Sequence, residues 1–213
     1  MNDQELKEQL AETTIDLYHR GCVTDKGGNL SVRSVERENA VWITPSQINK
    51  CSLNADSMVL VDFDGKKIEG AARPSVESVY HAGLMKLRKD VNAVVHTHAP
   101  MATAFGALDF EIPPIDLDAV LIMGYPKIPF FMAGSKDLAN AIFTAVGNSK
   151  VSGGFLCNHG LMTVGKDLQL AAEKTLLVEH VLKIVFMIKS THMEPKLLPE
   201  GAVKLLKQFA DVV

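Results

Sequence analysis

The stretch VVHTHAP, residues 94–100, places two histidines at the end of a β-branched run. A run of this kind, closed by a proline, is typical of a buried strand. Side chains alternate sides along a strand, so His96 and His98 project from one face and Thr97 from the other. The sequence therefore predicts a buried strand that brings two imidazoles to one site.

The segments before this strand have the patterns of helices and paired strands. A helix is predicted across residues 73–90, with Ser75 as its N-cap after Pro74 and an apolar stripe through Val79, Leu84 and Leu87. The elements expected before it are a helix that ends at Gly21, strands at 27–34 and 40–46, and a hairpin over 58–70 that turns at Asp64-Gly65.

The segments after the strand continue the mixture of helices and strands. Residues 111–132 show no clear period, and we expect them to be irregular. The other expected elements are helices at 101–108 and 136–147, strands at 154–160 and 161–165, and a long helix from Leu168 to Ile188 with Asp167 as its N-cap. Because no repeat, low-complexity tract or linker interrupts the chain, residues 1–213 are predicted to form a single α/β domain.

Composition excludes several classes of protein. Hydrophobic residues make up 47% of the 213-residue chain, which is enough for a sizeable core. A net charge of −3 without a basic run argues against a nucleic-acid partner. The N-terminus is unlike a signal peptide, and no segment is long and uncharged enough to span a membrane. Three scattered cysteines predict no disulfide framework, so we expect a cytoplasmic protein.

A third histidine changes the interpretation of the H-x-H pair. His159 stands in CNHGL, residues 157–161, between a short strand and a glycine, where a side chain can reach a pocket. His96 and His98 alone are as well explained by hydrogen-bonded core histidines. Three neutral imidazoles are instead a common set for a catalytic divalent metal such as Zn²⁺.

Glu77 is the candidate acid of this site. It stands near the start of the helix that leads into the His96 strand, where a carboxylate beside a cation is able to bind metal or carry a proton. The alternative is that an acid in a first helical turn only complements the helix dipole. His81, His180 and His192 have no partner motif and are interpreted as packing or hydrogen-bonding residues.

These motifs together resemble the class II aldolase/adducin family, which includes sugar-phosphate aldolases such as L-fuculose-phosphate aldolase, and a sugar-phosphate 4-epimerase. The segments that carry the resemblance are GGNLSVR at 27–33, ITPSQ at 43–47, RPSVES at 73–78, HTH at 96–98 and NHGLMTVG at 158–165. The resemblance implies a three-layer α/β/α domain around a mixed, mostly antiparallel sheet, and a homotetramer with sites between subunits.

The resemblance also implies roles for the site residues. His96, His98 and His159 would bind Zn²⁺, or another divalent metal such as Mn²⁺ or Co²⁺. Glu77 would be a metal ligand at rest and the acid/base during turnover. The implied reaction is reversible retro-aldol cleavage of a small sugar phosphate through a metal-stabilised enediolate.

Phosphate recognition is implied at Gly28, Asn29, Ser46 and Ser75, where backbone amides and hydroxyls would face an anion. Two residues depart from the family pattern, since Gln47 replaces a glycine and Val76 replaces a serine. Arg73 is a charged donor that could compensate. The alternative is that these are ordinary turn residues at strand ends.

Asp118 is predicted to enter the active site of an adjacent subunit as a second catalytic group. Counting back from Ile128-Pro129 places Asp118 where family members carry a residue that reaches the neighbouring site, whereas counting forward from the H-x-H motif places Leu117 there. An aspartate at this position would favour an epimerase or a decarboxylase of the same fold over an aldolase. A non-catalytic adducin-like interaction domain is the remaining alternative.

Overall fold

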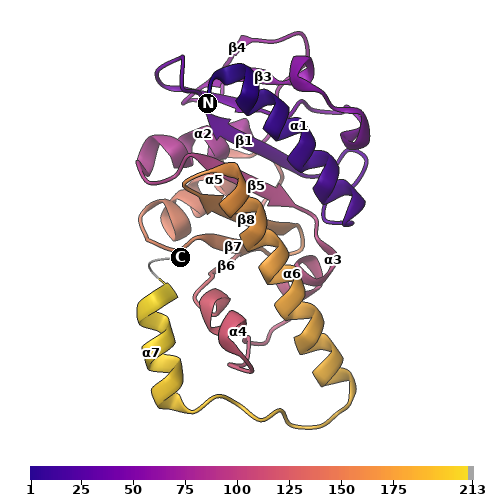
Figure 1. Ribbon diagram of the computed structural model, residues 1–213, viewed down its shortest axis with the longest axis vertical. Coiled ribbons are helices and arrows are strands. Elements are labelled where there is room, and N and C mark those ends of the chain that lie inside the picture. The colour runs from indigo at the N-terminus through magenta and orange to yellow at the C-terminus, as the bar shows by residue number, and fades with distance from the viewer. Residues whose placement is uncertain (211–213) are drawn as a thin grey trace.

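The computed structural model describes residues 1–210, and its described strands form one eight-stranded sheet (Figure 1). The strands lie in the order β4-β3-β2-β1-β5-β8-β7-β6. All neighbours pair antiparallel except β6 and β7, which are parallel. The strands are β1 Asn29–Arg33, β2 Ala40–Ile43, β3 Val59–Asp62, β4 Lys67–Glu69, β5 Ala93–Thr97, β6 Lys127–Ile128, β7 Gly153–Leu156 and β8 Gly160–Gly165.

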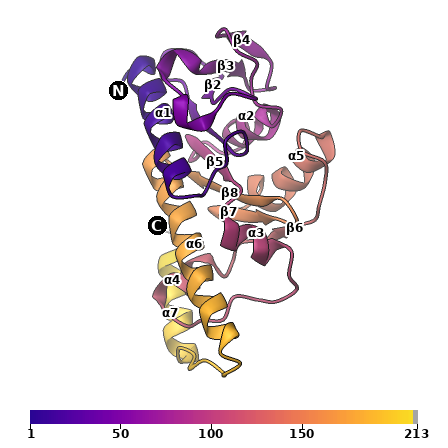
Figure 2. The same cartoon turned by 90° about the vertical axis from the view of Figure 1, so that its right-hand side faces the viewer.

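Helices cover both faces of the sheet, which gives the predicted three-layer α/β/α architecture. Figure 2 shows α1 and α6 on one side of the strands and α2 and α5 on the other. The α-helices are α1 Asp3–His19, α2 Ser78–Leu87, α3 Pro100–Gly106, α4 Leu117–Ile122, α5 Lys136–Ile142, α6 Leu168–Ser190 and α7 Glu200–Ala210. A π-helical turn, Phe143–Gly147, continues α5, and short 3₁₀ turns lie at Lys50–Ser52 and Ala55–Ser57.

Strand β5 separates two hydrophobic cores. Val95 packs in the core under α1 and α6, whereas Val94 packs in the core under α2 and α5. Both faces of the strand are buried, which explains why its sequence is an unbroken apolar run. Because residues two apart share a face, His96 projects with Val94 toward α2.

The first and last long helices begin and end as the sequence predicts. The side chain of Asp167 accepts a hydrogen bond from the Leu170 amide and caps α6. Gly21, with φ +73°, follows the end of α1, and Gly65, with φ +80°, turns the β3–β4 hairpin.

None of the described helices combines the length and the apolar character needed to cross a membrane. Within the described range the three cysteines are all unpaired.

The structure corrects the prediction for the helix before β5. Ser75 is not its N-cap, because α2 begins only at Ser78, after a turn in which the Ser78 amide donates to the Ser75 carbonyl at 3.1 Å. The expected apolar stripe is also wrong. Leu84 is buried, but Val79 and Leu87 are exposed, and α2 instead turns Tyr80, His81 and Met85 inward.

The segment 111–132, predicted to be irregular, contains helix α4 and strand β6. The Asp116 side chain caps α4 by accepting from the Ala119 amide at 2.7 Å. Ala119 and Ile122 pack into the core under α6. Tertiary packing therefore forms a helix that is too short for its sequence period to reveal. A single domain over residues 1–213 stays a prediction.

Candidate metal centre and active site

His96 and His98 converge at the end of β5, as the period of the strand predicts. Their ring centroids lie 5.0 Å apart. The Nδ1 atom of His96 lies 3.0 Å from the carbonyl oxygen of Leu161 on the neighbouring strand β8. That carbonyl fixes Nδ1–H as the donor, so the Nε2 lone pair of His96 faces the site.

His159 joins them from the turn between β7 and β8. Its ring lies 4.7 Å from that of His96 and 5.3 Å from that of His98, and ligating nitrogens of the three histidines lie within 4.8 Å of one another. Gly160 makes this approach possible, because a Cβ there would collide with the carbonyl oxygen of Thr97 on β5. The glycine of the N-H-G motif is therefore needed for the position of its histidine.

Glu77 meets the histidines from the N-terminus of α2. One carboxylate oxygen, Oε2, lies 3.4 Å from Nε2 of His96, and the other, Oε1, lies 3.7 Å from Nε2 of His159. The side-chain amide of Asn29 donates to Oε2 at 2.8 Å and fixes the orientation of the carboxylate. The structure thus places an oriented acid against two of the three imidazoles.

Burial keeps the three imidazoles neutral. Burial, helped by the neighbouring histidines, lowers the pKa of His96 to about 3 and that of His159 to about 4. The pKa of His98 is also lowered by burial. At neutral pH all three rings therefore offer lone pairs to a cation.

The unpartnered atoms of the site fit a divalent metal. Among the described residues, His96 Nε2, His159 Nδ1 and Glu77 Oε1 are buried without a hydrogen-bond partner. Buried polar atoms are normally paired, so His96 Nε2 and Glu77 Oε1, which lack partners where the His159 ring also approaches, fit a bound cation. Neutral imidazoles and one carboxylate are donors that Zn²⁺ and similar ions accept. His96, His98, His159 and Glu77 could hold such an ion.

The loop before β1 closes over the histidines, and its glycines are required. A Cβ on Gly27 would meet Nδ1 of His98 at 2.6 Å. Gly28 has φ +83°, and a Cβ there would meet the Val23 side chain at 2.6 Å and the His96 carbonyl oxygen at 3.1 Å. The GGN sequence is therefore explained by the close approach of this loop to β5.

The residues predicted to bind phosphate lie on neighbouring loops. The Ser46 amide donates to the Arg73 carbonyl at 2.9 Å, which joins the loop after β2 to the loop before α2. The Ser75 hydroxyl accepts from the Glu77 amide at 3.2 Å. Gln47 has φ +61°, the left-handed conformation that favours glycine. The side chain at this position therefore departs from the family pattern, but the backbone keeps a glycine-type conformation.

Lys50 is buried beside these loops, and the sequence gives no indication of this burial. Its side chain is 1% exposed, and its Nζ donates to the Pro45 carbonyl at 3.1 Å. It forms no ion pair with any described residue. Burial lowers its pKa to about 8, and its charge contributes to lowering the pKa of His96. A lysine is so rarely buried unpaired that sequence alone gave no reason to expect it.

The other predicted residues lie outside the histidine group. His81 is buried, and its Nδ1 lies 2.7 Å from the Ser31 hydroxyl, which confirms a hydrogen-bonding role. His180 and His192 are exposed, so a packing role is wrong for both, and the alternative hydrogen-bonding role stays a prediction. Asp118 lies half-buried in the first turn of α4, and its approach to a neighbouring subunit stays a prediction.

A carboxylate of α6 supports the start of helix α3, which follows His98. Glu179 accepts hydrogen bonds from the amides of Met101, at 2.9 and 3.1 Å, and Ala102, at 3.1 Å. The N-cap residue of α3, Ala99, has no side chain to do so. Glu179 therefore acts as a long-range cap that fixes the chain just beyond His98.

Comparison with known proteins agrees with this geometry. The family described as class II aldolase and adducin N-terminal domain matches residues 8–186. A 5-deoxy-D-ribulose 1-phosphate aldolase from Bacillus thuringiensis is 30% identical over 210 residues, which cover 97% of this chain and 96% of the relative. A 3-oxo-tetronate 4-phosphate decarboxylase from Haemophilus influenzae is 30% identical over 195 residues, covering 89% and 90% of the two chains.

A solved structure of an L-fuculose 1-phosphate aldolase has the same architecture. It superposes with a TM-score of 0.83 at 26% sequence identity, and the alignment covers 96% of this chain and 95% of that one. Sequence and structure therefore agree along nearly the whole chain. The chain belongs to the class II aldolase and adducin N-terminal domain family.

Proposed function

We propose that the protein is a zinc-dependent lyase that reversibly cleaves a C–C bond of a small sugar phosphate. The observation that carries this proposal is that three neutral imidazoles and one oriented carboxylate come together at one place. Some of their buried nitrogen and oxygen atoms have no hydrogen-bond partner among the described residues. The relatives, which are aldolases and a decarboxylase, support an enzyme rather than an adducin-like interaction domain.

The geometry supports the following roles. His96, His98 and His159 hold the divalent cation, which when bound supplies positive charge for oxygens of the substrate. Glu77 takes up and returns the proton on the carbon that becomes nucleophilic. Asn29 orients that carboxylate, since its amide is already committed to Oε2 of Glu77. This hydrogen bond uses one of the two N–H groups of the amide, so Asn29 positions the acid, and its contact with phosphate stays a proposal.

The phosphate of the substrate is proposed to lie on the loops around Gly28, Ser46 and Ser75. Two of these loops are joined by the hydrogen bond from the Ser46 amide to the Arg73 carbonyl, and the Arg73 side chain is exposed. A guanidinium on a loop of this kind is able to bind a phosphate with two parallel hydrogen bonds.

The metal assignment is tested by removing one ligand. His98→Ala should lose most bound metal and all turnover, as measured by elemental analysis and by assay with a sugar-phosphate substrate. His180→Ala, at an exposed histidine on α6, is the matched control and should keep both. Full metal content in a folded His98→Ala protein would overturn the assignment.

The role of Glu77 is tested separately from metal binding. Glu77→Gln should keep the fold and some bound metal, but an amide cannot act as a base at neutral pH. Exchange of solvent deuterium into dihydroxyacetone phosphate should therefore fall to background. Exchange at the wild-type rate would assign the proton transfer to another group.

A decarboxylase or a sugar-phosphate 4-epimerase of the same fold is the second candidate. The decarboxylase relative, which is 30% identical over 195 residues, favours the first of these. Asp118, in place of a tyrosine, is proposed to act from an adjacent subunit in either case. A screen of ketose phosphates and oxo-acid phosphates distinguishes the three, because only a decarboxylase releases CO₂, only an aldolase releases an aldehyde, and an epimerase releases neither.

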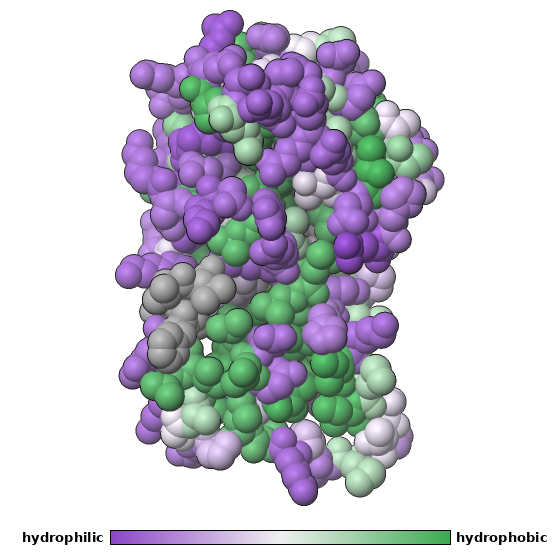
Figure 3. Space-filling model, viewed as in Figure 1, coloured by the Kyte–Doolittle hydropathy of each residue, from purple (hydrophilic) through white to green (hydrophobic). Residues whose placement is uncertain are grey.

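We propose a homotetramer with sites at its subunit contacts. Figure 3 shows apolar side chains gathered, with polar ones between them, over the half of the molecule that contains α4, α7 and the end of α6. Its exposed side chains include Leu117, Met187, Leu197 and Leu205, each more than half exposed. An apolar surface of this kind is typical of subunit contacts. Sedimentation equilibrium should give four times the mass of the chain. The cytoplasmic location expected from the sequence stays a prediction.

A further inference from the structure

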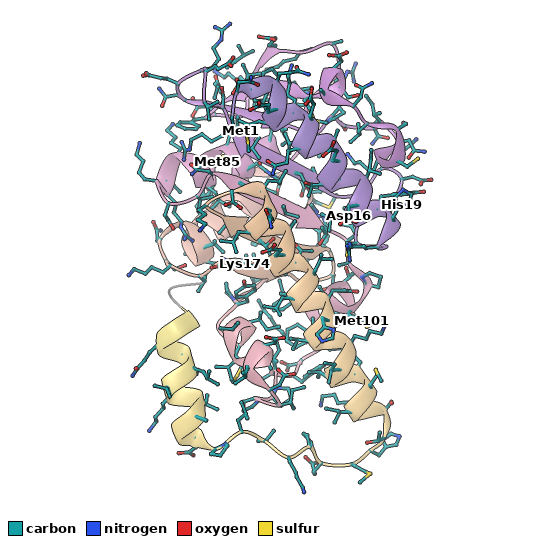
Figure 4. The ribbon with its side chains drawn as sticks, viewed as in Figure 1. Met1, Asp16, His19, Met85, Met101 and Lys174 are labelled. Atoms are coloured by element: carbon teal, nitrogen blue, oxygen red, sulfur yellow. The ribbon has the colours of Figure 1, made fainter. Side chains whose placement is uncertain are left out.

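A hollow lies at the opposite end of β5 from the histidines. It has a volume of about 720 Å³ and is lined by the residues that precede β5, those that follow β8, the turn before β7 and the first turns of α6. Figure 4 labels Lys174 on α6 and Met101 at the start of α3, toward opposite sides of the view. None of the residues that line the hollow belongs to the metal site.

The hollow collects positive charge. Its ionisable lining residues are Arg88, Lys89, Asp90, Lys150, Lys166 and Lys174. The only carboxylate of this set, Asp90, is bound by the Arg88 guanidinium at 2.6 Å. None of the four lysines forms an ion pair with a described residue. Four lysines and one arginine thus line one cavity that has a single carboxylate among its lining residues.

The packing around the hollow holds these like charges together. Arg88 is only 8% exposed, and its guanidinium also donates to the Val151 carbonyl at 2.6 Å. This hydrogen bond joins the loop before β5 to the turn before β7. Lys174 is half-buried beside it. Burial lowers the pKa of Lys174, as does the repulsion from Arg88 and Lys166, although Asp167 and Asp90 oppose this effect.

The long helix α6 adds to this potential. It runs for 23 residues, and Leu170 and Lys174, one turn apart on the side of the helix near its N-terminus, line the wall of the hollow. The N-terminus of a helix carries a partial positive charge and free amide donors. The Asp167 side chain occupies one of these donors, the Leu170 amide, and offsets part of this charge. The lysines therefore remain the main source of the potential.

We propose that this hollow binds a small phosphorylated anion at a site separate from the metal centre. Its volume lies in the range of small-molecule sites, which is roughly 300–1,000 Å³. Ammonium groups bind phosphate as point charges, and here they are arranged on four different segments around one space. An anion in the hollow would relieve the mutual repulsion of the lysines, so binding should be saturable and should weaken with salt.

The location is tested by lysine footprinting on the full protein. Acetylation with a water-soluble reagent, read by mass spectrometry, should be slowed at Lys89, Lys150 and Lys166 by millimolar pyrophosphate. Lys183, an exposed lysine on the same helix α6, is the internal control and should react at an unchanged rate. Equal reaction at all of these lysines with and without pyrophosphate would overturn the proposal, as would lysines in the hollow that do not react at all.

Affinity is tested with a charge-neutral double variant. In titration calorimetry, Lys150→Gln/Lys174→Gln should bind pyrophosphate at this site at least tenfold more weakly than the wild type does. Lys183→Gln should bind as the wild type does. Because neither change touches the histidines, metal content and turnover should stay unchanged. Pyrophosphate that binds at the metal site is fitted as a separate binding event. Unaltered affinity in the double variant would refute the site.

The source of the phosphoryl group is distinguished by two further ligands. ADP and ribose 5-phosphate are compared by the concentration that half-protects Lys150 from acetylation. Tighter protection by ADP assigns the site to nucleotides, and tighter protection by ribose 5-phosphate assigns it to sugar phosphates. Protection by neither, with pyrophosphate also failing, rejects the phosphorylated class altogether.

Discussion

The buried ammonium of Lys50 leads to a prediction in which the sign of the effect is unusual. Its Nζ contacts one carbonyl oxygen, that of Pro45, and its pKa is lowered from 10.5 to about 8 by burial. Lys50→Met keeps most of the side-chain volume and removes the charge. We expect this change at a fully buried site to make the protein more stable at neutral pH.

The magnitude follows from the pKa shift. A fall from 10.5 to about 8 means that the charged form costs about 3 kcal/mol in the folded protein at pH 7. Removal of the ammonium leaves the Pro45 carbonyl without its donor, which costs about 1 kcal/mol. The free energy of unfolding should therefore rise by about 2 kcal/mol at pH 7, from the difference of these two effects.

The pH dependence distinguishes this cause from better packing. Because the folded-state pKa lies below its ordinary value, the penalty is fully present below pH 8 and fades as the pH rises toward 10.5. At pH 10 only about 1 kcal/mol of the penalty remains, so the gain from Lys50→Met should vanish there. Wild-type stability should rise over the same interval through this group.

The measurement is urea unfolding between pH 7 and pH 10, followed by the fluorescence of Trp42, the single tryptophan of the chain. Protein concentration is matched and a chelator is present throughout, because subunit contacts and bound metal also change apparent stability. Lys26→Met, at an exposed lysine of the loop before β1, is the control and should have little effect. A Lys50→Met protein that is less stable at pH 7, or whose gain persists at pH 10, would refute the reasoning.

Three further predictions concern the site. Gly160→Ala should push β8 from the Thr97 carbonyl, lose metal in elemental analysis and unfold at lower urea, whereas wild-type metal content would contradict the close approach. Glu179→Gln should lower the free energy of unfolding in urea by about 1 kcal/mol, because the cap of α3 loses its charge. It should also weaken metal affinity in a chelator competition, and an unchanged affinity would show that the cap does not position His98. Asp118→Asn should lower kcat on the true substrate with little change in metal content, and an unchanged kcat would remove Asp118 from the chemistry.

The convergence of the histidines could be predicted because it depends on local rules. Period two in a strand places His96 and His98 on one face, and the structure confirms this. The approach of Glu77 to His96 could not be derived in the same way, because it depends on which strands are neighbours and on where α2 begins. For Glu77, as for His159, the pattern named a candidate, and the family resemblance assigned its role in the site.

Elsewhere the sequence was misleading for identifiable physical reasons. A serine after a proline was interpreted as the N-cap of α2, but Ser75 forms a turn and the helix begins three residues later. Helix α4 has only six residues, too few for a periodic signal, and its stability comes from packing under α6. Lys50 gave no signal, since a charged side chain is expected to be exposed.

The strand order has a consequence for how the protein acquires its metal. The contacts that build the site join residues far apart in the chain, such as Asn29 to Glu77 at 48 residues and His96 to the Leu161 carbonyl at 65 residues. Contacts of such long sequence separation form late, because the loop must be closed before they repay its entropy. An unfolded chain offers only the H-x-H pair to a cation, so the complete site should appear at the same rate as the β5–β8 pairing. The rate of metal uptake during refolding would then report the rate at which the central strands pair.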